Sequence, residues 1–253
     1  MIEKMRKLPI TAAVVHAFKS VVTYRRIGVR IGALWMAILF VLNGAELLLA
    51  GTGKVASGPG AIAEVLSVVA GLFAFSSIAV NWHRFILRDE MPSAATSLRL
   101  DAVVLRYLGN SILALLAGGV PLALLAAIVA FLPQAAIALL FPAGLAAGTF
   151  IMMLSLKLPA VALGRRDFTF GAALKTVEGN FWQIAGVFLL NALVIFVPAL
   201  ALTLLILLLR QASPALATAT GLVLSVPLNL FLTLFSVSVL TSLYGFFVEK
   251  RDF

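Results

Sequence analysis

Long apolar runs alternate with short polar segments along the chain, and six of the runs are long enough to cross a membrane. A spanning α-helix needs about 20 mostly apolar residues. The six runs cover residues 31–51, 61–82, 108–132, 135–158, 184–209 and 216–247. They lack the two-residue alternation that is typical of membrane β-strands. The pattern therefore predicts an all-α fold, a polytopic membrane bundle of six transmembrane helices.

Four of these predicted spans contain a proline. The prolines are Pro121, Pro142, Pro198 and Pro227. Each leaves a backbone carbonyl of the preceding turn without its helical donor, and inside lipid that carbonyl needs a partner from another group. We therefore expect the spans to pack against one another.

The basic segment of residues 1–30 predicts an amphipathic helix. Its apolar positions are Ile10, Val14, Ala17, Phe18 and Val21, and its polar positions are His16, Lys19, Ser20 and Thr23. Such a helix lies in the membrane interface with its apolar face toward the acyl chains. Because its basic residues attract anionic lipid, we expect it to lie on an anionic leaflet.

Similar amphipathic stretches lead into the third and fifth spans. Their apolar positions are Leu100, Val103, Val104, Tyr107 and Leu108 in one case and Phe170, Ala173, Leu174, Val177 and Phe181 in the other. Gly109-Asn110 and Gly179-Asn180 occupy similar places in the two stretches. One interpretation is three repeats of an amphipathic helix followed by a helical hairpin. The alternative is that unrelated interfacial segments share the same pattern.

The charges of the chain are few and unevenly distributed. Hydrophobic residues make up 62% of the sequence and charged residues 11%, which excludes a soluble globular domain. All 19 Lys and Arg residues except Lys54 and Arg210 fall on one side of the predicted spans. Positive residues favour the cytoplasmic side. Both termini of this multi-pass protein of the cytoplasmic (inner) membrane are therefore predicted to be cytoplasmic.

This topology divides the chain into three parts and explains its net charge of +9. The parts are a cytoplasmic basic segment of residues 1–30, a transmembrane domain of residues 31–247 and a cytoplasmic tail of residues 248–253. Because the basic charge follows from topology, we expect no nucleic-acid partner.

The segment after the second span, residues 81–92, gathers charged groups in a chain that has few of them. Tryptophan favours the headgroup level and arginine pairs with lipid phosphates. The segment is therefore a candidate docking site for anionic headgroups or for a protein partner. The candidate residues are Trp82, His83, Arg84, Arg88, Asp89 and Glu90. The alternative is a helix end whose charges are solvated and pair with one another.

Polar residues within the spans, or at their edges, are candidates for binding a solute inside the membrane. They are Asn43, Glu46, Asn110, Asn191 and Asn229. An ionisable group in lipid is costly, which makes Glu46 a functional candidate. It lies about 24 Å past Arg30 along a helix, near the outer interface, where this cost is lower. The alternative is that these residues form hydrogen bonds that hold helices together.

Gly144 and Gly148 have the spacing of the GxxxG motif, which lets two helices approach closely. This spacing predicts helix packing within the chain or, alternatively, a homodimer face.

Motifs for metal binding or catalysis are missing from the sequence. His16 and His83 are the two histidines, cysteine is absent, and the carboxylates are not spaced as metal ligands. There is no nucleophile motif and no pair of carboxylates inside the membrane. We therefore expect no metal, no cofactor and no catalytic residue.

The heptapeptide Thr176-Val177-Glu178-Gly179-Asn180-Phe181-Trp182 leads directly into the fifth span. It resembles the entry segments of the membrane domain of bacterial glycerophosphoryl diester phosphodiesterases. It is also similar to a related group of uncharacterised six-helix bacterial inner-membrane proteins, as are residues 81–90. The resemblance covers the lead-ins and hairpins of the second and third units. The soluble phosphodiesterase barrel has no counterpart in this sequence, so no catalytic residue is carried over.

The leading hypothesis is a non-enzymatic integral membrane protein that acts as a scaffold, an accessory or a lipid-interacting component. Membrane lipids with anionic headgroups at the cytoplasmic face are the expected partners, together with a protein partner or a second copy of the chain. A small transporter or channel is the alternative, because broken helices often surround a transport site. A membrane-embedded lipid enzyme is the third hypothesis.

Overall fold

The computed structural model describes residues 6–51, 58–93, 97–132 and 134–253, and the regular structure in these ranges is helical. The helices are α1 Ile10–Thr23, α2 Arg25–Gly51, α3 Pro59–Arg88, α5 Ala102–Val129, the 3-10 helix η1 Gln134–Leu139, α6 Leu140–Ser155, α7 Lys157–Ala162, α8 Phe170–Thr176, α9 Phe181–Ala212 and α10 Pro214–Phe247. Within these ranges, six helical stretches are long and apolar enough to cross a membrane. The predicted all-α bundle is confirmed, and the chain is an integral membrane protein.

Several of the long helices extend beyond the apolar runs that predict them, and α3 and α5 are two examples. Helix α3 continues to Arg88 instead of ending at Trp82, and α5 begins at Ala102 instead of Leu108. The Asp101 carboxylate caps α5 by accepting backbone N–H groups at 3.0 and 3.1 Å. An apolar run marks only the part of a helix that lies in lipid, so it does not show the ends that project from it.

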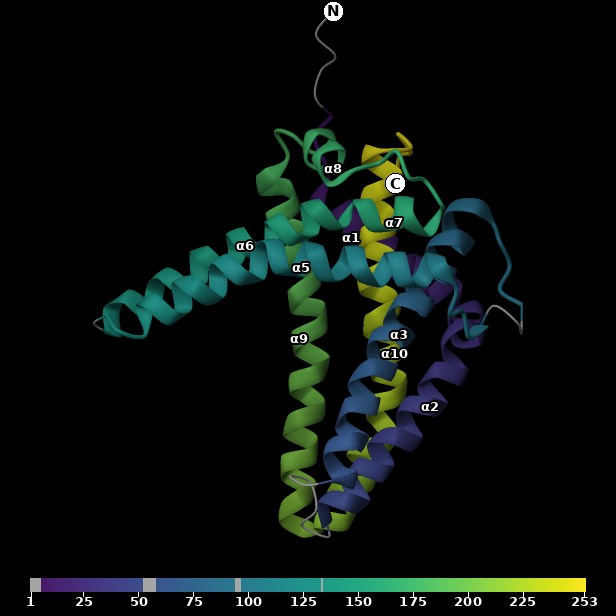
Figure 1. Cartoon of the computed structure of the whole chain (residues 1–253), viewed down its shortest axis with the longest axis vertical. Coiled ribbons are helices and arrows are strands. Elements are labelled where there is room, and N and C mark those ends of the chain that lie inside the picture. The colour runs from purple at the N-terminus through teal and green to yellow at the C-terminus, as the bar shows by residue number, and fades with distance from the viewer. Residues whose placement is uncertain (1–5, 52–57, 94–96, 133) are drawn as a thin grey trace, which may run out of the picture.

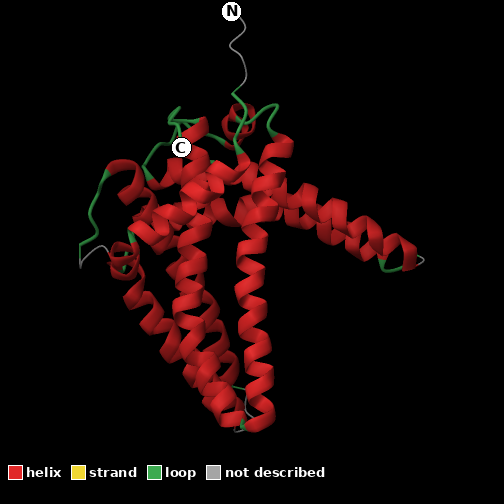
Figure 2. Ribbon diagram, turned by 180° about the vertical axis from the view of Figure 1, so that it is seen from behind, coloured by secondary structure: helices red, strands yellow, loops and turns green. Residues whose placement is uncertain are grey.

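The long helices α2, α3, α9 and α10 run alongside one another, and α5 and α6 diverge from them (Figures 1 and 2). Helix α10 contacts α9, α3 and α2 within the aligned group. Helices α5 and α6 form a hairpin that packs against α3, α7 and α9 and then projects to one side (Figure 1). The expected mutual packing therefore holds for the four aligned helices, and in the outer part of the hairpin it consists of α5 against α6.

The core lies at the end of the aligned group where α1, α7 and α8 are found, which we call the α1 end (Figure 1). There the last turns of α3 and α10 bury large side chains such as Trp82 and Tyr244. Toward the opposite end large apolar side chains are exposed, including Leu48 (77%) and Leu208 (70%). Exposed apolar surface of this kind is expected of helices that face lipid.

Helix α1 has the predicted amphipathic pattern, but its apolar face packs on protein instead of lipid. Its buried positions are Ala13, Val14, Ala17 and Val21. The helix contacts α10 and α9, while Phe18, predicted for the same face, is 46% exposed. Most of the face expected to meet the acyl chains is therefore covered by protein, and Phe18 is the member of it that stays exposed. An amphipathic pattern specifies an apolar environment without distinguishing lipid from a neighbouring helix.

The segment before α1 is held against the start of α9 by Asn180, which is 2% exposed. The side-chain oxygen of Asn180 accepts the N–H of Leu8 at 3.0 Å, and its amide donates to the Arg6 carbonyl at 3.2 Å. Gly179, with φ of +74°, forms the turn before Asn180, and its carbonyl accepts a hydrogen bond from the Lys7 ammonium at 2.6 Å. Gly179 and Asn180 of the heptapeptide thus have a structural role.

The three predicted repeat units differ from one another in structure. The lead-in is a separate helix in the first and third units, α1 and α8, but it is the first part of α5 in the second. Gly109-Asn110 lies inside α5, where the Asn110 amide donates to the Arg106 carbonyl at 2.7 Å. This pair therefore does not correspond in structure to Gly179-Asn180.

Close helix contacts occur at several glycines. A Cβ atom at Gly148 would collide with the Phe188 ring, so this glycine lets α6 approach α9, whereas Gly144 has open space around it. Packing within the chain thus explains one member of the predicted GxxxG pair. Gly28 and Gly32 have the same spacing and let α2 approach α10.

Candidate functional site

The predicted docking segment separates into a buried part and an exposed part. Trp82 and His83 are each 0% exposed, which corrects the expectation that they lie at the headgroup level. The Trp82 indole N–H donates to the Ser238 hydroxyl at 2.7 Å. These two residues belong to the packing of α3 against α10, because the helix continues past the point where its apolar run ends.

His83 forms a hydrogen bond through each ring nitrogen. Its Nδ1 lies 2.9 Å from the Thr241 hydroxyl oxygen, and its Nε2 lies 3.2 Å from the Tyr107 hydroxyl oxygen. The Thr241 hydroxyl donates to the Val237 carbonyl at 2.8 Å. Thr241 therefore accepts the Nδ1–H of a neutral imidazole, and Tyr107 donates to Nε2. The arrangement joins α3, α5 and α10 inside the protein.

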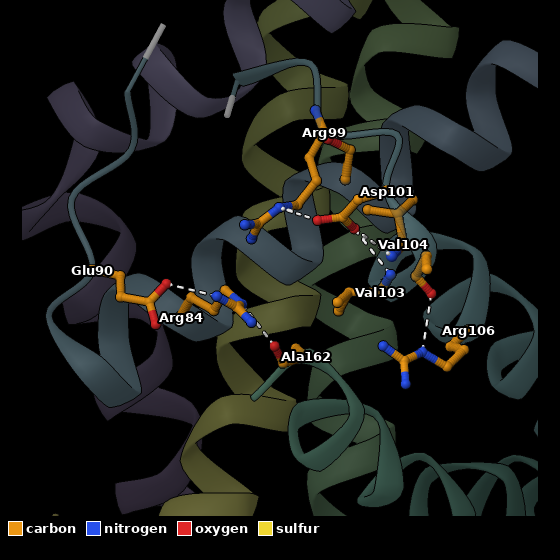
Figure 3. A network of polar contacts seen from close by, with 10 residues as sticks. Arg84, Glu90, Arg99, Asp101, Val103, Val104, Arg106 and Ala162 are labelled. Carbon is orange, nitrogen blue, oxygen red and sulfur yellow. Dashed lines mark hydrogen bonds and ion pairs between the residues drawn. The ribbon is translucent and has the colours of Figure 1, made fainter. Parts of the chain in front are cut away.

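The exposed part of the segment is largely paired within itself (Figure 3). Arg84 donates to the Ala162 carbonyl at 2.8 Å and forms an ion pair with Glu90 at 2.8 Å. Arg88 lies 3.8 Å from the same carboxylate, and Asp89 ends α3 in a left-handed conformation with φ of +54°. These contacts agree with the alternative interpretation of a helix end whose charges pair with one another.

Beside this cluster, α5, α7 and the turn after α7 border an open-sided hollow of about 400 Å³, which we call the basic cavity. Its lining residues are Arg106, Asn110, Lys157, Val161, Gly164, Arg165 and Arg166. Four of them are cations: Arg106, Lys157, Arg165 and Arg166. Among the residues that the structure describes, none of these four forms an ion pair with a carboxylate. Neighbouring Arg84 and Arg99, in contrast, each pair with an acid.

Local structure explains how these cations come to share one wall. Arg106 and Asn110 are one turn apart on α5 and therefore lie on the same face. Helix α7 ends at Ala162, and two residues later Gly164, with φ of +78°, reverses the chain. The Gly164 N–H donates to the Val161 carbonyl at 3.0 Å, and the Arg165 N–H donates to the Ala160 carbonyl at 2.9 Å. This helix end places the two arginines that follow it at the cavity wall.

The contacts of the four cations leave donors for a ligand. Arg165 donates from one terminal nitrogen to the Tyr244 hydroxyl at 3.0 Å, and the Lys157 ammonium lies 4.2 Å from the Phe170 ring centroid. Arg106 donates through Nε to the Ala102 carbonyl at 3.1 Å. A guanidinium has five N–H donors and an ammonium has three. The wall therefore presents unused donors that suit a phosphate or carboxylate.

The predicted intramembrane polar residues do not form a common site. They lie on α2, α5, α9 and α10, and among the described residues no hydrogen bond joins any two of them. Asn43 and Asn229 are exposed, whereas Glu46 Oε1 and Asn191 Oδ1 are buried oxygens without a hydrogen-bond partner in the described part of the chain. Asn110 lines the basic cavity.

The basic cavity could have been found from the sequence. Arg106 precedes the third span and Lys157 closes the fourth. The start of the first helix and the end of the second helix of an antiparallel hairpin lie close together at its base, so these two cations had to be neighbours. The concentration of charge in residues 81–92 gave a stronger signal, but its positive charges are matched by acids nearby.

Comparison of the chain with protein-family models, with curated proteins and with solved structures gave no match. The resemblance to the membrane domain of glycerophosphoryl diester phosphodiesterases therefore stays a prediction, and the function has to be argued from the geometry of the site.

Proposed function

We propose that the chain is a non-enzymatic component of the cytoplasmic membrane that binds anionic lipid headgroups in the basic cavity. The observation that carries this proposal is a wall of four cations without an ion-pair partner in the described part of the chain. Such cations form charge-assisted hydrogen bonds with phosphate oxygens. Basic pockets between membrane helices on the cytoplasmic side are suited to anionic headgroups.

The proposal requires the α1 end to face the cytoplasm, as the distribution of lysine and arginine predicts. Both termini would then be cytoplasmic, and the cavity would face the anionic leaflet. Arg84, Arg88 and Glu90 would lie near the bound headgroup, but their charges are already paired. A retained headgroup would hold the protein in anionic regions of the membrane, which is the scaffold or accessory role that we propose.

The test compares lipids that stay bound during purification in a mild detergent. Arg106→Gln with Arg166→Gln removes two exposed cations that form no ion pair in the described part of the chain, and the hydrogen bond of Arg106 stays within α5. Arg25→Gln with Arg26→Gln removes the same charge from exposed positions at the start of α2, outside the cavity. We expect the first variant, but not the second, to lose anionic lipid relative to zwitterionic lipid. Equal retention by both variants and the unmodified chain would refute the proposal.

A further inference from the structure

The hairpin that carries the basic cavity also contains an apolar groove. Between α5 and α6 lies a hollow of about 370 Å³ whose lining side chains are all apolar. Ala117 and Pro121 contribute to it from α5, and Ala143, Ala146 and Phe150 contribute from α6. Most of these side chains are small, which leaves space along the line where the two helices meet. We call this hollow the hairpin groove.

The packing of the hairpin fixes the position of the groove, because α5 and α6 are in close contact beside it. A Cβ atom at Gly118 would lie 2.5 Å from Ile151 Cγ1 and 3.0 Å from the Ala147 carbonyl oxygen. Gly118 therefore sets the helix separation. The alanines on either side do not fill the remaining space.

The groove and the basic cavity follow one another along α5 and along the consecutive helices α6 and α7. On α5, Asn110 and Ala117 are seven residues apart, which is about two turns and about 10 Å along the axis. Residues seven apart lie on nearly the same helix face. Phe150 of the groove lies on α6, and Lys157 of the cavity, seven residues later, is the first residue of α7. Cations therefore lie at the base of the hairpin and an apolar hollow lies about two turns further out.

This order matches the chemistry of an amphipathic anion. A free phosphate would use the cations alone, whereas a phospholipid also presents acyl chains that need an apolar surface. The outer part of the hairpin projects away from the four aligned helices, so lipid can reach it from the side (Figures 1 and 2). A glycerol backbone and the first acyl carbons can bridge the distance of about 10 Å between the two hollows.

We infer that the basic cavity and the hairpin groove form one site for an anionic phospholipid, with its phosphate on the four cations and one acyl chain in the groove. The inference rests on the proposed headgroup binding and adds the identity of the ligand and the position of its chain. It makes the diverging hairpin a lipid-binding element.

The experiment uses the full chain in nanodiscs and phosphatidylglycerol that carries a photoreactive diazirine on one acyl chain. Crosslinks should concentrate on α5 and α6 around Ala117 and Ala146. Ala117→Leu with Ala146→Leu fills the groove at exposed positions. It should reduce crosslinking roughly tenfold, the loss expected when about two methylene groups are no longer buried. The control, Ala123→Leu with Ala127→Leu, adds the same bulk at exposed positions of α5 outside the groove and should leave crosslinking unchanged.

The outcomes separate this inference from the proposed function. The Arg106→Gln, Arg166→Gln variant could lose anionic lipid while crosslinks are scattered over the bundle and filling the groove has no effect. That result would keep headgroup binding and overturn the acyl-chain site. Displacement of the probe by an equal concentration of inorganic phosphate would show a site for the free anion and also overturn it. A dimer in the nanodisc whose hairpins take up no lipid crosslink would assign the groove to a second copy and overturn the inference. Retention of anionic lipid by the arginine variant would overturn both proposals.

Discussion

Replacing Asn180 with alanine removes the side chain that holds the N-terminal segment against the start of α9. Two hydrogen bonds are lost, the one accepted from Leu8 N–H at 3.0 Å and the one donated to the Arg6 carbonyl at 3.2 Å. Leu8 is 3% exposed, so water does not readily replace the lost acceptor. A buried polar group left without a partner costs about 1–3 kcal/mol.

The loss should be local to the segment before α1. A change of about 1–3 kcal/mol in the opening equilibrium raises the open population roughly 5- to 150-fold, and proteolysis follows that population when closing is fast. Cleavage by trypsin after Lys7, whose ammonium contacts the Gly179 carbonyl at 2.6 Å, reports this opening directly. We therefore expect faster cleavage at Lys7, with a smaller shift in the thermal unfolding of the whole protein in detergent.

Asn229→Ala is the matched control, because Asn229 is an exposed asparagine with no hydrogen bond to another element in the described structure. Its cleavage rate should equal that of the unmodified chain. Equal rates for Asn180→Ala and Asn229→Ala would refute the reasoning, because they would show that the Asn180 hydrogen bonds do not hold the segment.

Three further predictions concern the buried network, the pH dependence and the topology. Tyr107→Phe removes the hydroxyl that donates to His83 Nε2 and should lower the free energy of unfolding by about 1–3 kcal/mol, measured by denaturant titration in detergent. The pKa of His16 is lowered from its ordinary 6.5 by partial burial of the imidazole and, secondarily, by Lys19, so the folded state binds fewer protons than the unfolded state. Stability should therefore fall as pH drops below about 6.5, and His16→Gln should reduce this slope of the melting temperature with pH. The chain has no cysteine, so Ser213→Cys should react with an impermeant thiol reagent from outside intact cells, and Arg166→Cys only after permeabilisation; the reverse pattern would overturn the proposed orientation.

The apolar runs were sufficient to predict six long helices, because burial of the backbone in lipid leaves few alternatives to a helix. They could not predict which helices pack together. Helices α9 and α10 are apolar on all sides, so their sequences mark no preferred face. The divergence of the α5–α6 hairpin depends on contacts made at its base, and these have no periodic signature.

The candidate site was predicted only in part, because a sequence shows where charges are but not how they are matched. Residues 84–90 contain two arginines and two acids, and the fold pairs both arginines with Glu90. Arg106 and Lys157 are 51 positions apart, and only the return of the hairpin brings them to one wall. Trp82 has the sequence context of an interfacial anchor, yet the continuation of α3 buries it.

The central claim is that unpaired cations of the basic cavity select an anionic headgroup, and a lipid titration followed by native mass spectrometry tests it most directly. The measured quantity is the ratio of the dissociation constants for phosphatidylcholine and phosphatidylglycerol. Each cation near an anionic lipid contributes about 1 kcal/mol, so removing two should reduce this ratio roughly 30-fold. The account predicts that reduction for Arg106→Gln with Arg166→Gln and no change for Arg25→Gln with Arg26→Gln. An unchanged ratio in the cavity variant, or an equal reduction in both, would contradict it.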